Sequence, residues 1–322
     1  MLDAIKYLIG AAGPSGFGSK STAEDVTCAC NLQSLTAIIT GATSGIGAET
    51  ARVLAKRGAR LIIPARNLKA AEDVKSRIQK EIPTAEIIVM ELDLSSFASI
   101  RRFATNFNSC DLPLNILINN AGKFCHEFQV SQDGFEMTLA TNHLGHFLLT
   151  RLLLNKMIET ANETGIQGRI VNVSSGIHSW MGRERIQFDQ LNDPKSYDAT
   201  RAYAQSKLAN ILHTKELSLR LEKMKANVTA NSIHPGIVRT RITRDRDGLI
   251  TDLVFFLASK LLKSIPQAAS TTCYVAVHPN LKSISGKYFA DCNEASASSV
   301  ANDPNKAMEL WRDSDAIVAS YV

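Results

Sequence analysis

The feature that most constrains this chain is a regular alternation of short apolar runs with longer stretches of helical periodicity, which begins at Leu35. Short runs rich in β-branched residues predict strands, and apolar positions spaced about 3.6 residues apart predict amphipathic helices. The predicted strands are 36–40, 60–63, 86–92, 115–119, 169–174 and 227–233. The predicted helices cover 46–57, 68–82, 97–107, 145–158 and 201–224.

This alternation of strand and helix is typical of a parallel sheet with helices on both faces. Strands buried on both sides explain why the runs are continuously apolar. Because crossovers are right-handed, we predict a doubly wound α/β sheet of Rossmann type, with its ligand crevice at the carboxyl ends of the strands. We expect an N-terminal arm at 1–33 and a single domain at 34–322, divided into a cofactor half to about 165 and a catalytic and substrate half from about 166.

Composition excludes several classes of protein. Hydrophobic residues make up 45% and charged residues 21%, which excludes a disordered tail, a collagen-like chain and a coiled coil. The net charge of +5 is scattered, so a nucleic-acid partner is not expected, whereas a small anionic ligand fits equally well. No apolar stretch reaches 18 residues, so no transmembrane helix is expected.

The cysteines and the N-terminal segment bear on the compartment. We expect all six cysteines to be unpaired thiols, because the close pair Cys28 and Cys30 lacks both the redox spacing and a histidine partner for zinc. The segment before residue 33 joins an apolar stretch at 5–12 to a loop at 13–18, without the features of a secretory signal or a transit peptide. We therefore interpret it as an arm that touches a membrane or a partner surface.

A glycine-rich turn follows the first predicted strand and opens the first helix. Gly41 allows the tight turn, Gly45 admits a phosphate close to the backbone, and Gly47 lets the helix pack against the strand. A pyrophosphate at such a helix N-terminus meets unpaired N–H groups and the positive end of the helix dipole. A turn without a ligand is the alternative, but the strand before and the helix after favour a dinucleotide site.

The end of the second predicted strand bears on the choice of dinucleotide. An NAD enzyme places a carboxylate there for the ribose 2′-hydroxyl, whereas this chain has Arg66 followed by Asn67. A guanidinium binds a 2′-phosphate, which a carboxylate would repel. We therefore predict NADP(H), with a solvated loop charge as the alternative role of Arg66.

Together with the turn spacing G-x-x-x-G-x-G, several motifs in order resemble the short-chain dehydrogenase/reductase family over about residues 35–290. They are Asp93-Leu94, Asn119-Asn120-Ala121-Gly122, Asn142, Ser174-Ser175, Tyr203-Ala204-Gln205-Ser206-Lys207, and Pro235-Gly236 with Thr240. The resemblance completes the predicted cofactor site, which consists of Gly41, Ser44, Gly45, Ile46, Gly47, Arg66, Asn67, Asp93, Leu94, Asn120, Ala121, Gly122, Tyr203, Lys207, Pro235, Gly236 and Thr240. It also implies Tyr203, Lys207, Ser175 and Asn142 as the catalytic residues.

Two further features narrow the resemblance. The run from Asn142 to Phe147 and the gap of 28 positions between Ser175 and Tyr203 resemble the retinol-dehydrogenase-like branch. The N-terminal sequence at 14–27 is similar to plant members related to a component of the chloroplast inner-envelope translocon (Tic). Lys123 departs from the apolar residue that relatives carry after the N-N-A-G motif.

The chemistry expected of Tyr203 depends on Lys207, which lies one helical turn later on the same face. We expect the ammonium, with the charge of an oxidised nicotinamide, to lower the phenol pKa, so that Tyr203 donates a proton in reduction and removes one in oxidation. The alternative is a helix with Tyr and Lys on a solvated face. By resemblance, Lys207 also binds the nicotinamide ribose.

Ser175 is expected to hydrogen-bond the substrate oxygen. Strand alternation from Val171 and Val173 places Ser174 and Ser175 on opposite faces, and the family uses the second serine, so Ser174 is the alternative. By resemblance, Asn142 bends its helix and holds a water in a proton relay from Lys207; a helix N-cap is its alternative role.

The substrate is predicted to be lipophilic. His178 and Trp180 follow Ser175 closely enough to line a pocket, and Phe124 is a further candidate. Residues 183–200 are expected to form a loop beside the crevice. By resemblance, the apolar stretch 241–262 forms the substrate lid, with a core helix as the alternative. No third ligand accompanies His143 and His146, so no metal is expected.

These observations predict an NADP(H)-dependent oxidoreductase acting on the carbonyl or hydroxyl group of a lipophilic small molecule. The alternative is a redox-sensing, nucleotide-binding component of a chloroplast protein-import complex, with peripheral membrane or translocon association. A module that only binds nucleotide, or an epimerase, fits the motifs poorly. The resemblance implies dimerisation through the helices of Asn142 and Tyr203, although a monomer suits this branch, and both the cytoplasm and the chloroplast fit the arm.

Overall fold

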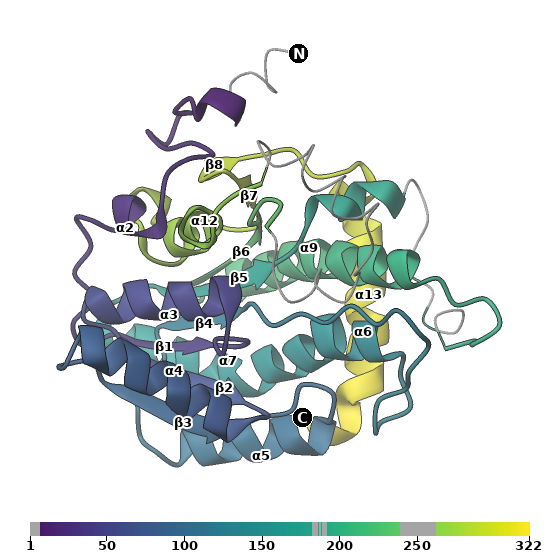
Figure 1. The fold of residues 1–322 in the computed structure, drawn as a ribbon. Helices are drawn as coiled ribbons and strands as arrows, with labels where there is room; N and C mark the ends of the chain where they lie inside the picture. Colours follow the sequence, from purple (N-terminus) through teal and green to yellow (C-terminus); the bar gives the residue numbers. More distant parts are fainter. Residues whose placement is uncertain (1–6, 182–185, 187, 189–191, 239–261) are drawn as a thin grey trace.

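The computed structural model describes residues 7–181, 186, 188, 192–238 and 262–322. Its centre is an eight-stranded sheet in the order β3-β2-β1-β4-β5-β6-β7-β8 (Figure 1). The first seven strands pair in parallel, and β8 is antiparallel to β7. The strands are β1 (Thr36–Ile39), β2 (Arg60–Ala65), β3 (Ile87–Glu91), β4 (Ile116–Asn119), β5 (Gly168–Val173), β6 (Val228–His234), β7 (Tyr288–Ala290) and β8 (Asn293–Glu294).

The six predicted strands and the doubly wound α/β sheet are therefore confirmed. The alternation of side chains explains the apolar runs, since Ala37 and Ile39 of β1 enter the core on one face of the sheet while Ile38 enters the core on the other. The short strand β7 and the edge strand β8 were not predicted, because two or three residues are too few to show a periodic pattern.

The helices form two layers, which we name face A and face B. Face A consists of α2 (Ala23–Val26), α3 (Gly45–Lys56), α4 (Leu68–Glu81) and α12 (Ile265–Val277), which share one apolar core with the sheet. Face B consists of α5 (Phe97–Asn108), α7 (Gly145–Thr164), α9 (Ala199–Lys223) and α13 (Pro304–Val318), which share the other. The described residues also form short elements: α6 (Met137–Leu139), the π-helical turn η1 (Ala140–Leu144), and the 3₁₀ turns η2 (Gly176–Met181), η4 (Pro279–Leu281), η5 (Val300–Asn302) and η6 (Ala319–Tyr321).

The five predicted helices are found, whereas α12 and α13 were not predicted. Helix α12 is buried around almost its whole circumference, so its sequence lacks the polar stripe that marks an amphipathic helix. Helix α13 lies beyond the part of the chain that carries the family motifs and packs on α9 (Figure 1).

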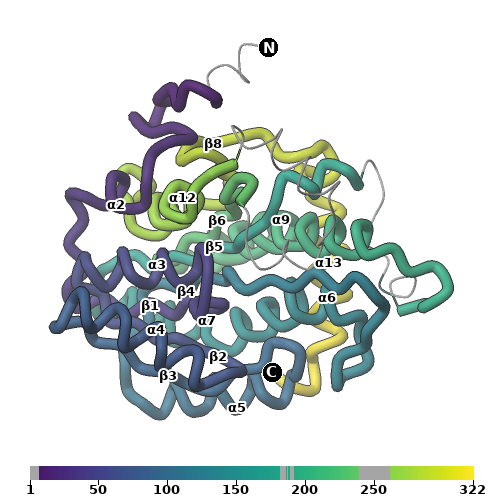
Figure 2. Tube along the Cα trace, viewed as in Figure 1, coloured from purple at the N-terminus to yellow at the C-terminus, as the bar shows by residue number. Residues whose placement is uncertain are grey.

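Residues 17–30 of the N-terminal segment pack on face A, so this described part is not a separate arm. Ala23 and Val26 are buried in the core of this face. The ring of Phe17 meets that of Tyr274 edge-on at a centroid distance of 5.8 Å. The amide of Asn293 donates to the Phe17 carbonyl at 3.0 Å, so the segment lies against β8, as the purple tube in Figure 2 shows. Packing therefore does not divide the chain at residue 33.

Two further expectations concern thiols and membranes. All six cysteines are free in the structure, as predicted. Within the described ranges, no helix combines the length and the apolar character needed to cross a bilayer.

Candidate active site

The glycine turn between β1 and α3 leaves the start of α3 open. Gly41 and Gly45 have positive φ angles of 68° and 56°, which favour glycine. A Cβ atom on Gly41 would lie 2.7 Å from Cα of Ala121, and one on Gly47 would collide with the carbonyl of Gly41. Ser44 is the N-cap of α3, yet its side chain makes no capping hydrogen bond. Since no acidic side chain lies in the first turn either, the N-terminus of α3 suits an anion such as a pyrophosphate.

The loop after β4 is hydrogen-bonded to this turn. The Asn120 amide donates to the Thr40 carbonyl at 2.8 Å. The Thr40 hydroxyl accepts from the backbone N–H groups of Asn120 (2.9 Å) and Ala121 (3.0 Å). The N-N-A-G motif therefore adjoins the glycine turn, as its predicted cofactor role requires.

Arg66 is the first residue after β2, and its side chain is exposed. No described acidic residue forms an ion pair with it. Asn67 caps α4, with its side-chain oxygen accepting from the Ala70 N–H at 3.0 Å. The guanidinium is therefore available at the carboxyl end of the second strand, and the neighbouring strand β3 ends at Glu91, whose side chain pairs with Arg102 at 3.6 Å.

The Asp93-Leu94 motif lies in the turn after β3. The Asp93 carboxylate accepts from the Ser95 N–H at 2.9 Å and from its hydroxyl at 2.6 Å. Leu94 is buried, and its carbonyl lies so close to Gly145 that a Cβ there would collide with it. The motif thus supports the beginning of α7, and the carboxylate of Asp93 is used within its own turn.

Tyr203 and Lys207 lie together in the second and third turns of α9. The Lys207 Nζ atom is 5.4 Å from the centroid of the Tyr203 ring and donates to the Val173 carbonyl at 3.2 Å. Lys207 is only 3% exposed, and this is the one hydrogen bond that its ammonium makes to a described residue. The ring of Phe124 packs on Tyr203 at a centroid distance of 5.4 Å. The structure therefore places the tyrosine, the lysine and the end of β5 together, and excludes the solvated-face alternative.

The pKa values of this pair shift in opposite directions. Burial raises the pKa of Tyr203 to about 12 and lowers the pKa of Lys207 to about 8. In the protein without a dinucleotide, burial determines both directions, because loss of hydration penalises the charged form of each group. The neutral phenol is a proton donor rather than a phenolate in this state. That Lys207 and an oxidised nicotinamide together lower the phenol pKa stays a prediction for the complex.

The two serines after β5 have different surroundings. Ser174 is buried, and its hydroxyl donates to the Lys207 carbonyl at 2.7 Å. Ser175 is half-buried, and its hydroxyl oxygen accepts only a long bond of 3.4 Å from the Ile177 N–H. The Ser174 hydroxyl is thus used in anchoring α9, which favours Ser175 as the serine that can meet a substrate.

Asn142 lies inside the π-helical turn η1 and is fully buried. Its side-chain oxygen accepts from the Lys123 N–H at 2.7 Å, and its amide donates to the Lys123 carbonyl at 2.9 Å and to the Ser206 hydroxyl at 3.0 Å. The N-cap alternative is wrong, because α6 runs into η1 and η1 runs into α7 without a capping break. Asn142 instead links the loop after β4 to α9, beside Lys207.

The two predicted substrate residues, His178 and Trp180, differ in their burial. His178 is buried, with its Nδ1–H donating to the Ser175 carbonyl at 2.7 Å and Nε2 accepting from the Ser298 N–H at 3.1 Å. It therefore braces the Ser175 loop. Trp180 is 75% exposed, next to residues 182–185, which lie outside the described residues.

The Pro235-Gly236 turn follows β6, and sequence analysis missed its partner. A Cβ on Gly236 would lie 2.7 Å from Cδ of Lys263. Lys263 is 5% exposed and pairs with Asp291 at 2.5 Å. No motif marks Lys263, since only folding brings it under the turn. Thr240 and the predicted lid up to residue 261 lie outside the described residues.

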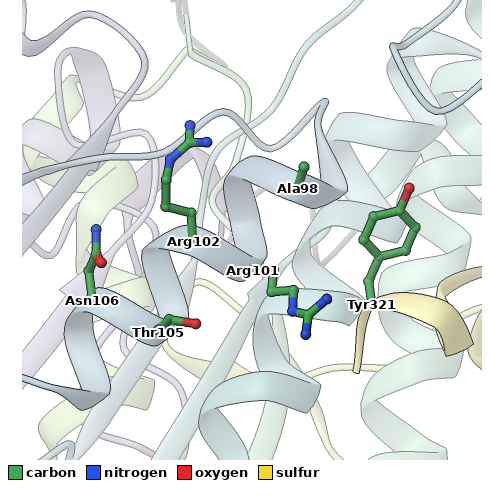
Figure 3. A pocket seen from close by; sticks show the side chains of 6 residues that line it. All are labelled: Ala98, Arg101, Arg102, Thr105, Asn106 and Tyr321. Atoms are coloured by element: carbon green, nitrogen blue, oxygen red, sulfur yellow. The ribbon is translucent and has the colours of Figure 1, made fainter.

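A separate pocket of about 310 Å³ lies on the outer side of α5. Figure 3 shows its lining residues, which are Ala98, Arg101, Arg102, Thr105, Asn106 and Tyr321. None of the predicted site residues lines it, so it is not the predicted crevice. In the part of the chain that the structure describes, no group of three or more His, Cys, Asp and Glu side chains could hold a metal ion.

Comparison with known proteins is consistent with this geometry. The family model for short chain dehydrogenases matches residues 35–186. The chain is 53% identical to "Short-chain dehydrogenase TIC 32 A, chloroplastic" of Brassica napus over 97% of both chains. It is 43% identical to "Retinol dehydrogenase 12" of Bos taurus over 85% of this chain and 83% of that protein.

Solved structures agree. A crystal structure of an uncharacterised protein from Mycobacterium paratuberculosis is 31% identical, with a TM-score of 0.73 over 91% of this chain and 97% of that chain. L-Sorbose reductase from Gluconobacter frateurii, complexed with NADPH and L-sorbose, is 18% identical with a TM-score of 0.64 over 84% of this chain and 98% of that chain, and it supports the fold alone.

Proposed function

The chain belongs to the short-chain dehydrogenase/reductase family and is thereby an oxidoreductase of alcohol or carbonyl groups. From this premise we propose that it is an NADP(H)-dependent enzyme for lipophilic substrates. In this proposal Tyr203 is the acid in reduction and the base in oxidation. The observation that carries this proposal is the grouping of Tyr203, Lys207 and the Ser175 loop near the end of β5.

The described residues fit a nicotinamide dinucleotide. The open N-terminus of α3, with Gly41 and Gly45 in left-handed conformations, would hold the pyrophosphate. The buried ammonium of Lys207 makes one hydrogen bond to a described residue and retains N–H donors for the ribose hydroxyls. The proposed adenosine side of the site is completed by Asn67, Asp93 and Leu94. The proposed nicotinamide side is completed by Ala121, Gly122 and the turn at Pro235-Gly236. When bound, the nicotinamide supplies or accepts the hydride.

Arg66 supports NADP(H) rather than NAD(H). Its exposed guanidinium follows β2, where a 2′-phosphate would lie, and β2 does not end in a carboxylate. The test is to measure the Kd of NADPH and NADH for the wild type and for Arg66→Ala. We expect the variant to lose about tenfold in NADPH affinity and little in NADH affinity. A wild-type preference for NADH would overturn the cofactor proposal.

The proton steps follow from the arrangement of side chains. In reduction, the Tyr203 hydroxyl donates its proton to the substrate oxygen as that oxygen gains negative charge, and the Ser175 hydroxyl hydrogen-bonds the same oxygen. The raised pKa of Tyr203 keeps the proton on the phenol until it is needed. Lys207, 5.4 Å from the ring centroid, then stabilises the phenolate that remains. In oxidation the same phenolate removes the proton of the alcohol.

Tyr203→Phe is the central test. We expect NADPH still to bind, while kcat for carbonyl reduction falls by about 10²–10⁴-fold. Tyr197→Phe is a matched control, because the Tyr197 hydroxyl donates to the Cys125 carbonyl at 2.7 Å instead of facing Lys207. Wild-type turnover by Tyr203→Phe would remove the tyrosine from the acid role.

Two observations support a lipophilic substrate. The Phe124 ring covers one side of Tyr203, and several relatives are named retinol dehydrogenases. With NADPH, kcat/KM should rise along a series of aldehydes of increasing chain length. A preference for sugars over all of these aldehydes would contradict the proposal.

A second candidate is a redox-sensing, nucleotide-binding component of a chloroplast protein-import complex, attached peripherally to the inner envelope. The identity of 53% to the relative named TIC 32 A, chloroplastic, favours it. In that case the purified protein would bind NADPH but oxidise it with no member of a broad carbonyl panel, and NADPH would change its association with membrane fractions. Turnover with a member of the panel would favour the enzyme. Chloroplast localisation is part of both proposals.

We propose a monomer. Helix α13 packs along α9, and its Asp315 pairs with Arg151 of α7 at 3.0 Å, so it occupies the outer faces of the helices expected to form a dimer. Light scattering at the size of a dimer would contradict this.

A further inference from the structure

His146 lies in the first turn of α7 and has a defined partner on each ring nitrogen. It is 3% exposed. Its Nδ1 atom is 3.0 Å from the carbonyl oxygen of Asn142, and its Nε2 atom is 2.8 Å from the hydroxyl oxygen of Thr40. Because a carbonyl can only accept, Nδ1 carries the proton and donates to Asn142. Nε2 is then the acceptor of the Thr40 hydroxyl proton.

The alternative acceptor for the Thr40 hydroxyl is the Ile118 carbonyl, at the longer distance of 3.3 Å. That choice would leave two lone pairs facing each other across 2.8 Å between Thr40 and a neutral His146. Burial, with a smaller contribution from nearby Lys207, lowers the pKa of His146 to about 4, so the ring is neutral at pH 7. The hydroxyl proton therefore goes to His146, while the hydroxyl oxygen accepts the two backbone N–H groups of the N-N-A-G loop.

This bridge joins two parts of the site that are far apart in sequence. Thr40 immediately precedes Gly41, where the turn around the start of α3 begins. Asn142 contacts Ser206, the residue before Lys207. The imidazole of His146 thus bridges the turn proposed for the dinucleotide and the π-helical turn beside Lys207 by one hydrogen bond to each.

We propose that His146 is a positioning residue for the reaction: its Nδ1–H···Asn142 bond orients the π-helical turn toward Lys207, and its Nε2···Thr40 bond holds the dinucleotide turn. The proposal rests on the function proposed above. His146 touches neither substrate nor dinucleotide and acts through Asn142 and Thr40.

The two bonds can be tested separately, because Asn places a donor near the position of Nδ1 and Gln an acceptor near that of Nε2. His146→Phe, which makes neither bond, should lower kcat by about 10–100-fold and weaken NADPH binding. His146→Asn should recover mainly kcat, and His146→Gln mainly the Kd of NADPH. The matched control is His143→Phe, since His143 lies one turn earlier and pairs with the Ser314 hydroxyl of α13 at 2.9 Å. It should leave kcat and the Kd unchanged.

A readout without turnover completes the test. The ¹⁵N spectrum of the imidazoles in the cofactor-free protein should show His146 as a neutral Nδ1–H tautomer. An Nε2–H tautomer would overturn the proposal, as would wild-type kcat and NADPH affinity in a folded His146→Phe protein. If Tyr203→Phe keeps full turnover while the His146 variants still split as expected, the proposed acid role fails and the positioning role stands.

Discussion

The two faces of the sheet differ in the titratable groups that they bury. On face A the charges lie at the rim, where Arg52 pairs with Glu24 (2.6 Å), Glu49 (2.9 Å) and Glu81 (2.7 Å) on partly exposed side chains. On face B histidines lie inside, near α7, α9 and α13, where His143 and His213 are buried with ring centroids 6.0 Å apart. The face that carries Tyr203 and Lys207 thus also contains buried histidines that are neutral at pH 7.

Stacked rings pack in the interior of face B. His213 stacks on Trp311 of α13 at 5.5 Å with an interplanar angle of 4°. The Arg220 guanidinium covers the same indole, 4.4 Å from its centroid. Neither ring nitrogen of His213 has a hydrogen-bond partner among the described residues. Such a histidine is tolerated only while neutral, which makes face B sensitive to protons and face A sensitive to the loss of ion pairs.

The largest expected effect is therefore acid destabilisation between pH 7 and pH 5. Burial lowers the pKa of His143 to about 3 and of His146 to about 4, and places that of His213 well below its usual value. The unfolded chain binds protons at these histidines below about pH 6.5, whereas the folded chain does not, so stability falls as pH falls. Each histidine accounts for up to about 2 kcal/mol at pH 5. Urea unfolding at pH 7, 6 and 5 measures it, and a flat profile would contradict the contrast between the faces.

Trp311→Ala should come next, with a loss of about 3–5 kcal/mol in the free energy of unfolding at pH 7, because it removes the buried ring between His213 and Arg220. Met308→Ala on the same helix is the control, since Met308 is 55% exposed and its truncation should change stability little. Equal losses from the two variants would show that α13 does not pack as described. Thermal or urea unfolding provides the measurement.

His213→Phe should have a smaller effect at pH 7, within about 1 kcal/mol, because it replaces a polar ring without hydrogen bonds by an apolar ring of similar shape. Its informative effect is on the pH dependence of the free energy of unfolding. In the variant, one proton fewer should be taken up on unfolding in acid. If the slope between pH 6 and pH 5 does not change, another group titrates in this range.

The smallest effect is expected on face A. Hydrogen bonds from Lys56 and Arg52 hold the pKa of Glu24 at about 2, so its contribution is present above the usual carboxylate range and is lost only as pH falls toward 2. Because the side chain is 37% exposed, Glu24→Gln should cost about 1 kcal/mol or less. A larger loss than that of Trp311→Ala would reverse the ranking of the two faces.

Much of the fold was predictable because its signals are local. The six strands follow from runs such as 169–174, and Gly41, Gly45 and Gly47 mark the turn because only glycine suits its conformations and close approaches. Helix α12 was not predicted, because it is buried on almost every side and its sequence therefore lacks amphipathic periodicity. The N-terminal segment was interpreted as an arm because its loop composition does not reveal that Phe17 packs on Tyr274.

The sequence by itself determined the order of strands and helices along the chain, since their periodicity is local. Its motifs also identified Tyr203, Lys207 and Ser175 as candidates, through the resemblance to a family. Only the tertiary structure decided the direction of the Tyr203 pKa, the use of Ser174 to anchor α9, and the bridge from Thr40 to Asn142 through His146. Hydration and hydrogen-bond partners depend on which remote segments meet, and a linear pattern does not record this.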